Sequence, residues 1–228
     1  MEKKEFPKQK VVLEDTIEEV APVKKRNWFV DRFFDITKLL LGICFLPWVY
    51  AITISLFAEM AKINLALQRY FWTGVISFVL FYLFILEPKK IYEKGHKLVE
   101  IIFAFFQPFV KVAPYLFPIY SIVVFLIYII LSAFIKANWL LNYALFLLGF
   151  SLSLHLVFAS KAVKAKKGGI LKANYIFGFS FIYILNLLLL AGIFSVIFEK
   201  FSFVSFCNLS YLQASSIFKA VFAQLFKV

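Results

Sequence analysis

The sequence has few charged residues, only two histidines and only two cysteines among its 228 residues. Charged side chains make up 17% of the chain and hydrophobic ones 63%, whereas soluble domains are about a quarter charged and about half apolar. This composition excludes a soluble globular domain. Two cysteines make no disulfide framework, and the chain has no CxxC pair, no phosphate-binding glycine loop and no nucleophile elbow. We therefore expect a polytopic membrane protein whose solvent is the lipid bilayer.

Acidic residues are nearly absent after the first 35 residues. Residues 1–35 hold eight basic and eight acidic side chains, and the rest of the chain holds 17 basic and five acidic ones. The net charge of +12 therefore belongs to the apolar body and its loops. Such a distribution is typical of cytoplasmic loops of membrane proteins, so we expect no nucleic-acid partner. The neutral mixture in 1–35 predicts a disordered, charged cytoplasmic tail.

Five charge-free runs reach or approach the length of about 20 residues that a helix needs to cross a bilayer. Helices are the expected form, because hydrocarbon cannot satisfy exposed backbone groups and no barrel-like alternation of polarity is present. The sequence thus predicts an all-α bundle of about five to six transmembrane helices over residues 36–198. The runs are 39–57, 70–86, 112–135, 137–160 and 173–198.

Lysines cluster in two of the loops between these runs. Residues 87–99 contain four lysines and residues 161–172 contain five, whereas the intervening loops hold only Lys62 with Arg69, and Lys136. The positive-inside rule places lysine-rich loops in the cytoplasm. We therefore predict a multi-pass protein of the cytoplasmic (inner) membrane, with its amino terminus in the cytoplasm and, for five crossings, its carboxyl terminus outside.

Two segments do not fit a simple crossing. Residues 90–107 are amphipathic at first and then wholly apolar, and the prolines that follow at 108, 114 and 118 break or kink helices. Residues 199–228 place apolar side chains on one helical face, as an amphipathic carboxyl-terminal helix would. Such a helix lies in the membrane interface or forms a partial sixth crossing.

Three polar features in apolar surroundings are the candidates for chemistry. His96 and Glu100 lie four residues apart and would share a helix face, which is the geometry of two metal ligands and equally that of a solvated surface stripe. His155 lies toward the cytoplasmic end of the fourth run and Asn186 near the middle of the fifth. Intramembrane polar groups usually face the bundle interior or a water-filled cavity. The structural alternative is hydrogen bonding between helices for Asn186 and a packed, hydrogen-bonded side chain for His155.

Read together, these segments resemble one family. Residues 95–104, which begin Gly-His-Lys-Leu-Val-Glu, resemble the Gly-His-Glu-Leu-Thr-His-Ala segment of site-2 protease-like intramembrane zinc metallopeptidases. Residues 112–120 resemble the Ala-Pro-Tyr-x-x-Pro-x-Tyr run of some bacterial members. The segments around His155 and over 181–186 are similar to later helices of that group, in the same order. The resemblance covers roughly residues 90–190.

The same comparison implies that the site is degenerate. In the family, two histidines and a distant Asp hold zinc, and the Glu after the first His activates water. Here His96 matches the first ligand, but Lys97 stands at the general-base position and Glu100 replaces the second histidine. Residues 166–171 supply no acid, and the segment 106–113 leaves no room for the substrate-clamping hairpin. The resemblance therefore implies a non-proteolytic member with no catalytic residue and no cofactor.

Three functions remain open at this stage. The preferred one is a catalytically inactive membrane protein that binds or stabilises another membrane protein. A second is an active zinc metalloprotease with an altered site formed by His96 and Glu100, with His155. The third is a small transporter or channel component, in which broken helices over 108–118 and Asn186 would form a midplane site.

Overall fold

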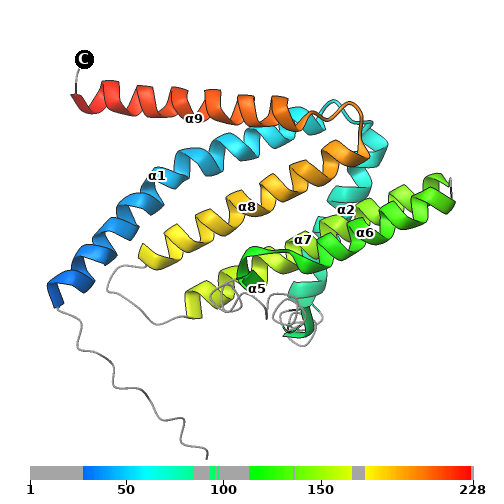
Figure 1. The fold of residues 1–228 in the computed structure, drawn as a ribbon, viewed down its shortest axis with the longest axis horizontal. Helices are drawn as coiled ribbons and strands as arrows, with labels where there is room; N and C mark the ends of the chain where they lie inside the picture. Colours follow the sequence, from blue (N-terminus) through cyan, green and yellow to red (C-terminus); the bar gives the residue numbers. More distant parts are fainter. Residues whose placement is uncertain are drawn as a thin grey trace, which may run out of the picture.

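A computed structural model describes residues 28–84, 93–95, 97, 113–135, 137–165 and 173–226. These residues contain helices and connecting loops but no strand, so the predicted all-α class is confirmed (Figure 1). The helices with defined bounds are α1 (Trp28–Met60), α2 (Leu65–Phe84), α5 (Ala113–Leu116), α6 (Ile119–Phe134), α7 (Asn138–Ala165), α8 (Ala173–Ile197) and α9 (Phe203–Phe226).

Four of these helices, α1, α2, α7 and α8, are long and apolar enough to cross a membrane. They coincide with four of the five predicted runs, which confirms a membrane protein built from transmembrane helices. α1 begins at Trp28 and therefore overlaps the end of the predicted tail. The remainder of that tail, residues 1–27, lies outside the described residues.

The third predicted run, 112–135, is not one continuous helix. It is divided at Phe117 and Pro118 into the single turn α5 and the 16-residue α6. Proline has no N–H to donate and its ring clashes with the preceding turn, which favours a break at residue 118, although α1 continues through Pro47. The N–H of Ile119 instead donates to the carbonyl of Phe117 at 2.9 Å. α6 is about 24 Å long at 1.5 Å per residue, which is shorter than the hydrocarbon core.

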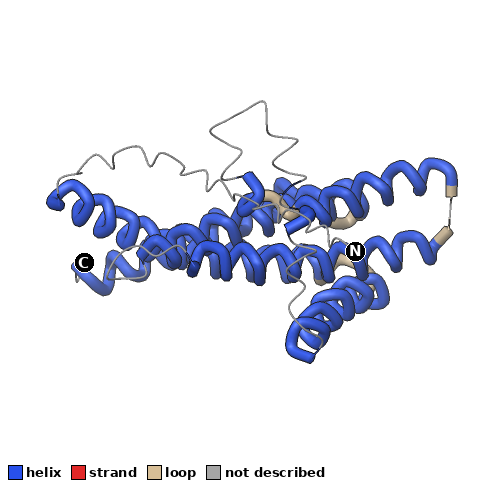
Figure 2. The backbone as a smooth tube through the Cα atoms, turned by 90° about the horizontal axis from the view of Figure 1, so that it is seen from below, coloured by secondary structure: helices blue, strands red, loops and turns tan. Residues whose placement is uncertain are grey.

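The long helices form two parallel pairs. Early in α1 and α8, the rings of Phe45 and Phe177 stack with centroids 5.5 Å apart. Farther along both, the hydroxyls of Thr53 and Tyr183 lie 3.0 Å apart. α2 and α7 also progress in the same direction, since Phe78 contacts Phe150 and, farther along both helices, Tyr82 contacts Phe158. Figure 1 shows that α2 crosses α7 steeply, whereas α1, α6, α7, α8 and α9 run lengthwise along the bundle, which is also the long direction of Figure 2. Because α2 and α7 are parallel, the chain between them must return along the bundle, and α6, antiparallel to α7, makes that return.

α7 is the central helix, since it packs against α2, α6 and α8. Two glycines allow α2 and α7 to touch through their backbones. A Cβ at Gly74 would lie 2.0 Å from the carbonyl oxygen of Phe146, and one at Gly149 would lie 2.2 Å from that of Phe71. No larger side chain fits either position without separating the helices, which is how small residues serve membrane helix pairs.

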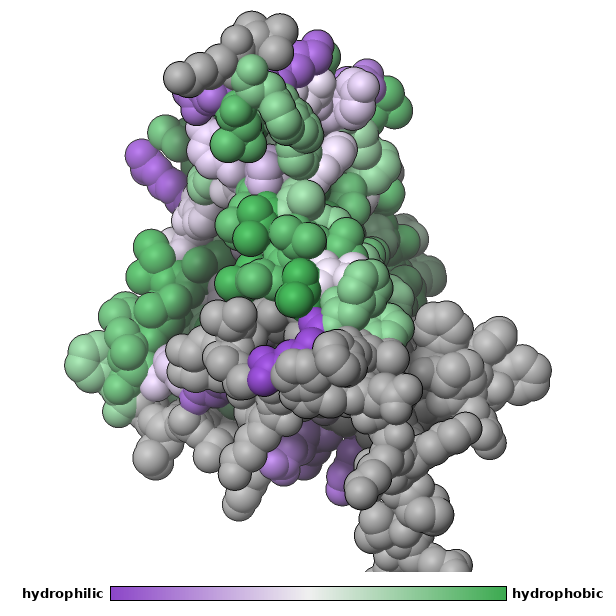
Figure 3. Space-filling model, turned by 90° about the vertical axis from the view of Figure 1, so that its left-hand side faces the viewer, coloured by the Kyte–Doolittle hydropathy of each residue, from purple (hydrophilic) through white to green (hydrophobic). Residues whose placement is uncertain are grey.

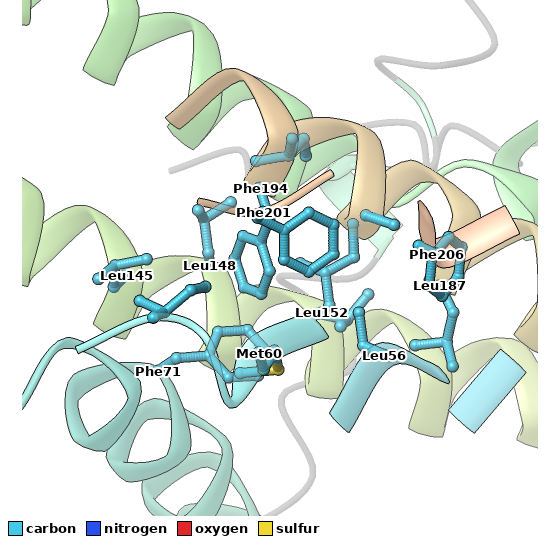
Figure 4. Packing of buried hydrophobic residues seen from close by; sticks show 14 of the residues in the cluster. Leu56, Met60, Phe71, Leu145, Leu148, Leu152, Leu187, Phe194, Phe201 and Phe206 are labelled. Carbon is cyan, nitrogen blue, oxygen red and sulfur yellow. The ribbon is translucent and has the colours of Figure 1, made fainter. Parts of the chain in front are cut away.

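The main core lies at the junction of α1, α2, α7 and α8, where the α8–α9 turn also enters (Figure 4). Phe194 from α8 is its centre, with the ring of Phe71 at 5.3 Å and that of Phe201 at 5.7 Å, both edge to face. These contacts join α2, α8 and the start of α9. The face seen in Figure 3 is largely apolar over its middle, as expected for a chain in lipid.

α9 runs back along α1 in the opposite direction, so that the carboxyl end lies toward the end of the bundle where α1 begins (Figure 1). Only one narrow stripe of α9 is buried, formed by Phe206, Ser210 and Ala214 at four-residue spacing. The sequence left open whether residues 199–228 lie flat on the membrane or cross it. α9 packs antiparallel to α1 and is not among the four helices that are long and apolar enough to cross a membrane.

Candidate functional site

The break between α5 and α6 is the place where the predicted polar residues meet. In a continuous helix the carbonyls of Tyr115 and Leu116 would accept hydrogen bonds from the N–H groups of residues 119 and 120. At the break, the side chain of Asn186 donates to the carbonyl of Leu116 at 3.1 Å. His155 makes a hydrogen bond to the backbone of Tyr115. Two residues from α7 and α8 thus bind adjacent carbonyls of one interrupted helix.

Asn186 is fully buried, with 0% of its surface exposed. Its amide nitrogen also donates to the carbonyl of Ile182 one turn earlier, at 2.7 Å. Its Oδ1 atom has no hydrogen-bond partner among the described residues. Close by, the hydroxyls of Ser121 on α6 and Ser151 on α7 lie 2.9 Å apart. The geometry of Asn186 matches the interhelical hydrogen bonding that the sequence offered as its structural alternative.

The predicted metal-site segment is only partly within the described residues. His96 and Glu100 lie outside them, so their shared face stays a prediction. Lys97 is helical and exposed. Gly95 is buried against α6, because a Cβ there would lie 2.6 Å from the ring of Tyr120.

The candidate ligands His96 and Glu100 lie outside the described residues, so the fit to zinc is tested only on the rest of the chain that the structure describes. The described part of the chain holds no group of three His, Cys, Asp or Glu side chains that would bind a metal ion. At the segment the resemblance singles out, Lys97 adds a cation where the family has an acid, and a cation disfavours a bound metal ion.

A buried carboxylate that sequence reasoning missed joins α9 to α1. Glu59, in the last turn of α1, has 0% of its surface exposed and accepts a hydrogen bond from the half-exposed Lys62. The backbone N–H of Ser202 donates to Glu59 at 3.2 Å, and the hydroxyl of Ser205 donates to it at 2.7 Å. The carboxylate therefore lies at the amino-terminal end of α9, where the helix dipole and unpaired N–H groups favour a negative charge.

The sequence contains one signal that Glu59 is unusual. Glu59 is the single acidic residue between positions 36 and 86, and it follows an apolar run directly. Its partners lie about 140 positions later, beyond the reach of any local pattern. The contact makes Glu59 a structural residue that holds the start of α9.

A cavity of about 220 Å³ lies between α1, α2, α7 and α8. Most of its lining is apolar, and its hydroxyl groups already have acceptors. Thr53 donates to the carbonyl of Val49 at 2.6 Å and Ser153 to that of Gly149 at 2.9 Å, while Tyr183 bonds to Thr53. The cavity therefore offers a polar substrate no uncommitted hydroxyl donor.

The outward face of α9 differs from the rest of the lipid-facing surface. Asn208, Ser215 and Lys219 share a helical face opposite the buried stripe, and we call them the α9 polar stripe. Asn208 and Lys219 are exposed and Ser215 is half-buried. Within the described part of the chain, none of the three side chains makes a hydrogen bond or ion pair. Figure 3 shows the contrast, since the top of the view, formed by α9, mixes hydrophilic and hydrophobic residues.

No family model, no curated protein and no solved structure matches the chain.

Proposed function

We propose that this chain is a non-proteolytic membrane protein of the cytoplasmic membrane that binds another membrane protein through the α9 polar stripe. The proposal rests on one observation: Asn208, Ser215 and Lys219 lie on the outward side of a helix that packs along α1. An amide facing hydrocarbon without a partner is costly, and a helix of another protein satisfies it with an interhelical hydrogen bond. Lipid tails supply no such partner.

The proposal requires α9 to cross the membrane beside α1. The helix has 24 residues, which is about 36 Å at 1.5 Å per residue and enough for a bilayer. α9 is not among the four helices that are long and apolar enough to cross a membrane on their own. Its polar side chains account for that difference, and they comprise the stripe and also the exposed Gln213, Ser216 and Gln224 on other faces of the helix. Lys219 lies 16 positions after Phe203, so its long side chain reaches the headgroups at the far side.

The orientation follows from the charges at the two ends of the bundle. The start of α1 carries Arg32 and Lys38, and the end of α7 carries Lys161, and these ends lie together because α1 and α7 are antiparallel. We assign this end to the cytoplasm by the positive-inside rule. A sixth crossing by α9 then returns the carboxyl end to the cytoplasm, in contrast to the five-crossing expectation.

The absence of proteolysis rests on Lys97. A protonated amine accepts no proton from water, so it cannot act as the general base of a zinc peptidase. The purified full-length chain is expected to hold less than stoichiometric zinc and to leave a transmembrane substrate uncut. Chelator-sensitive cleavage would overturn this part of the proposal.

A photo-crosslinking amino acid tests the binding surface in native membranes. Placed at Leu212, which is 62% exposed beside the stripe, it is expected to give a protein adduct that Asn208→Leu abolishes. The matched control is Leu46, which is 49% exposed on the lipid side of α1. Adducts with lipid alone at Leu212, or protein adducts that ignore Asn208→Leu, would contradict the proposal.

Labelling tests the crossing of α9 separately. In a chain whose Cys44 and Cys207 are replaced by Ser, single cysteines at Lys97, Lys200 and Phe226 are exposed to a membrane-impermeant maleimide. Lys97→Cys and Phe226→Cys are expected to react from the cytoplasmic side, and Lys200→Cys from the other. Reaction of Phe226→Cys on the same side as Lys200→Cys would show that α9 does not cross.

A further inference from the structure

We infer that the cavity between α1, α2, α7 and α8 holds one acyl chain of an anionic phospholipid whose phosphate lies at Arg69. This binding site goes beyond the proposed function, since neither the cavity nor Arg69 belongs to the α9 polar stripe. Four properties of the cavity support it: its opening, its size, the chemistry of its wall and the cation at its edge.

The cavity lies between the two helix pairs and reaches the surface of the bundle at α1 and α2. The pairs are α1 with α8 and α2 with α7, and they are joined where α7 packs against α8. Phe57 of α1 lines the cavity and is 49% exposed. Its ring stacks on that of Trp72 from α2, with centroids 5.4 Å apart. The cavity and the outer surface therefore share this side chain, and a molecule of the bilayer can enter between α1 and α2.

The size of the cavity suits a slender chain and not a helix. Its volume is about 220 Å³, and an apolar cavity of about 150 Å³ is already large enough to bind benzene. One turn of helix, about 5.4 Å long and about 10 Å across, would need about 420 Å³. A helix of a partner protein therefore does not fit, whereas part of one acyl chain does.

The wall of the cavity favours hydrocarbon over water or a polar solute. Nine of its twelve lining residues are aliphatic or aromatic. Of the three hydroxyl residues, Thr53 and Ser153 donate to carbonyls of their own helices, and Tyr183 bonds to Thr53. A buried water needs two to four polar partners, whereas a hydrocarbon chain needs only the dispersion contacts of an apolar wall. Four of the apolar lining residues are labelled in Figure 4: Leu56, Phe71, Leu152 and Leu187.

The depth of the cavity places it within one leaflet of the bilayer. Phe57 and Thr53 lie three and seven positions before Met60, the last residue of α1, which is about 5 and 10 Å at 1.5 Å per residue. The hydrocarbon of one leaflet is about 15 Å thick. An acyl chain that enters from the headgroups at the α1–α2 loop therefore reaches the cavity.

A cation lies at the edge of the cavity on the side of that loop. Arg69 precedes Trp72 by three positions, so the two side chains are neighbours on the surface of α2. Arg69 is exposed, and within the part of the chain that the structure describes it forms no ion pair or hydrogen bond. The nearby Lys62 is paired with Glu59, so Arg69 leaves this edge positive. A guanidinium binds phosphate through two parallel hydrogen bonds, and its charge favours an anionic headgroup.

Quenching of Trp72 fluorescence by a brominated lipid tests the inference in nanodiscs. Brominated phosphatidylglycerol is titrated into a phosphatidylcholine bilayer that holds the full-length chain with Trp72 as its single tryptophan. Quenching is expected to saturate at a low fraction of brominated lipid, because a bound acyl chain lies against this ring. The other tryptophans are removed by Trp28→Phe, Trp48→Phe and Trp139→Phe.

The matched control keeps only Trp139, which is 54% exposed on α7 and does not line the cavity. Its quenching is expected to rise in proportion to the fraction of brominated lipid, as for a ring in contact with bulk lipid. Equal titration curves for the two single-tryptophan chains would overturn the inference.

Substitution of Arg69 tests the phosphate contact without disturbing the interior. Arg69→Gln is expected to raise the half-saturating lipid fraction about fivefold, the effect of one basic residue at an anionic lipid. Lys200→Gln, at an exposed cation in the α8–α9 turn, should leave that fraction unchanged. An unchanged curve for Arg69→Gln, or an equal curve with brominated phosphatidylcholine, would overturn the assignment of an anionic phospholipid.

Filling the cavity tests the acyl-chain contact. Val75→Phe places a ring in the cavity and is expected to abolish the saturating part of the Trp72 quenching. Val79→Phe makes the same change one turn farther along α2, at a residue that is 44% exposed and outside the lining, and should keep it. Saturation that survives Val75→Phe in a folded chain would show that the lipid lies on the outer surface, which overturns the inference. If Val75→Phe does not fold, the exposed substitution Arg69→Gln still decides.

Discussion

The interior of the bundle and the outward face of α9 both contain polar side chains, but they differ in how those side chains are satisfied. Asn186 and His155 bind the backbone of residues 115 and 116 at the break between α5 and α6. Asn208 and Lys219 are exposed and make no hydrogen bond within the described part of the chain. The interior residues complete this fold, whereas the outward ones require something beyond it.

This difference changes which residues point to function. A buried polar group in an apolar bundle attracts attention because burying it is costly. When such a group donates to a carbonyl at a helix break, as Asn186 does to Leu116, that hydrogen bond offsets part of the cost, while Asn186 Oδ1 has no partner among the described residues. A polar group on a lipid-facing surface without a hydrogen bond inside its own chain has nothing to offset this cost. It is therefore the better indicator of a partner.

The largest effect is expected where the interior depends on close helix contact. Gly149→Leu places side-chain atoms against the carbonyl of Phe71 and should separate α2 from α7, at a cost of about 3 kcal/mol or more. Thermal unfolding and size-exclusion profiles in detergent measure it. Gly192→Leu is the control, since a Cβ there meets nothing within 4 Å. Equal stability of the two variants would refute the close contact.

A smaller loss is expected from Asn186→Leu. The part-buried carbonyl of Leu116 would lose this donor, which costs about 1 to 2 kcal/mol. Thermal unfolding again measures it, and Ser195→Ala is the control, because that hydroxyl bonds only to its own helix at Gly192. A variant of parental stability that has lost a solute flux in proteoliposomes would instead favour the transporter alternative.

Glu59→Gln should cost less, about 1 kcal/mol. The amide oxygen can still accept from Ser202 or Ser205, and the lost partner Lys62 is 47% exposed, so water screens the ion pair. Limited proteolysis at the α8–α9 turn should become faster. Glu199→Gln, an exposed acid in the same turn, should leave the cleavage rate unchanged. Equal rates for both variants would mean that Glu59 does not anchor α9.

The smallest effect on the chain itself is expected from Asn208→Leu. Its side chain has no partner within the described residues, so the unfolding free energy of the detergent-solubilised monomer should change by about 0.5 kcal/mol or less. The same substitution should abolish the Leu212 adduct in membranes. A monomer destabilised as strongly as by Asn186→Leu would erase the distinction between the two regions.

Local pattern was enough to predict the helical crossings. Runs without charge marked α1, α2, α7 and α8, because in hydrocarbon a long apolar segment has only the helix in which to satisfy its backbone. The prolines at 108, 114 and 118 also predict a break in this part of the chain, whereas the absence of charge predicts one crossing over 112–135. The structure divides it at Phe117 and Pro118, whereas α1 continues through Pro47, so a proline alone does not predict whether a helix breaks.

The candidate site was predictable only in part. His155 and Asn186 stood out by rarity, and the alternative of a hydrogen-bonded structural role was available for both. Their common target was not, because Leu116 and Asn186 are 70 positions apart. Glu59 was not among the predicted site residues, because it lies at the end of an apolar run. Its partners are separated from it by more than 140 positions.

The amino-acid sequence alone determined that this is a helical membrane protein and where most of its crossings lie, because hydropathy and helix length are local properties. Only the tertiary structure decided which polar side chains are satisfied within the chain and which face outward. That outcome depends on how α7, α8 and α9 pack against helices distant in sequence, and a hydrogen bond between helices exists only once both are in place.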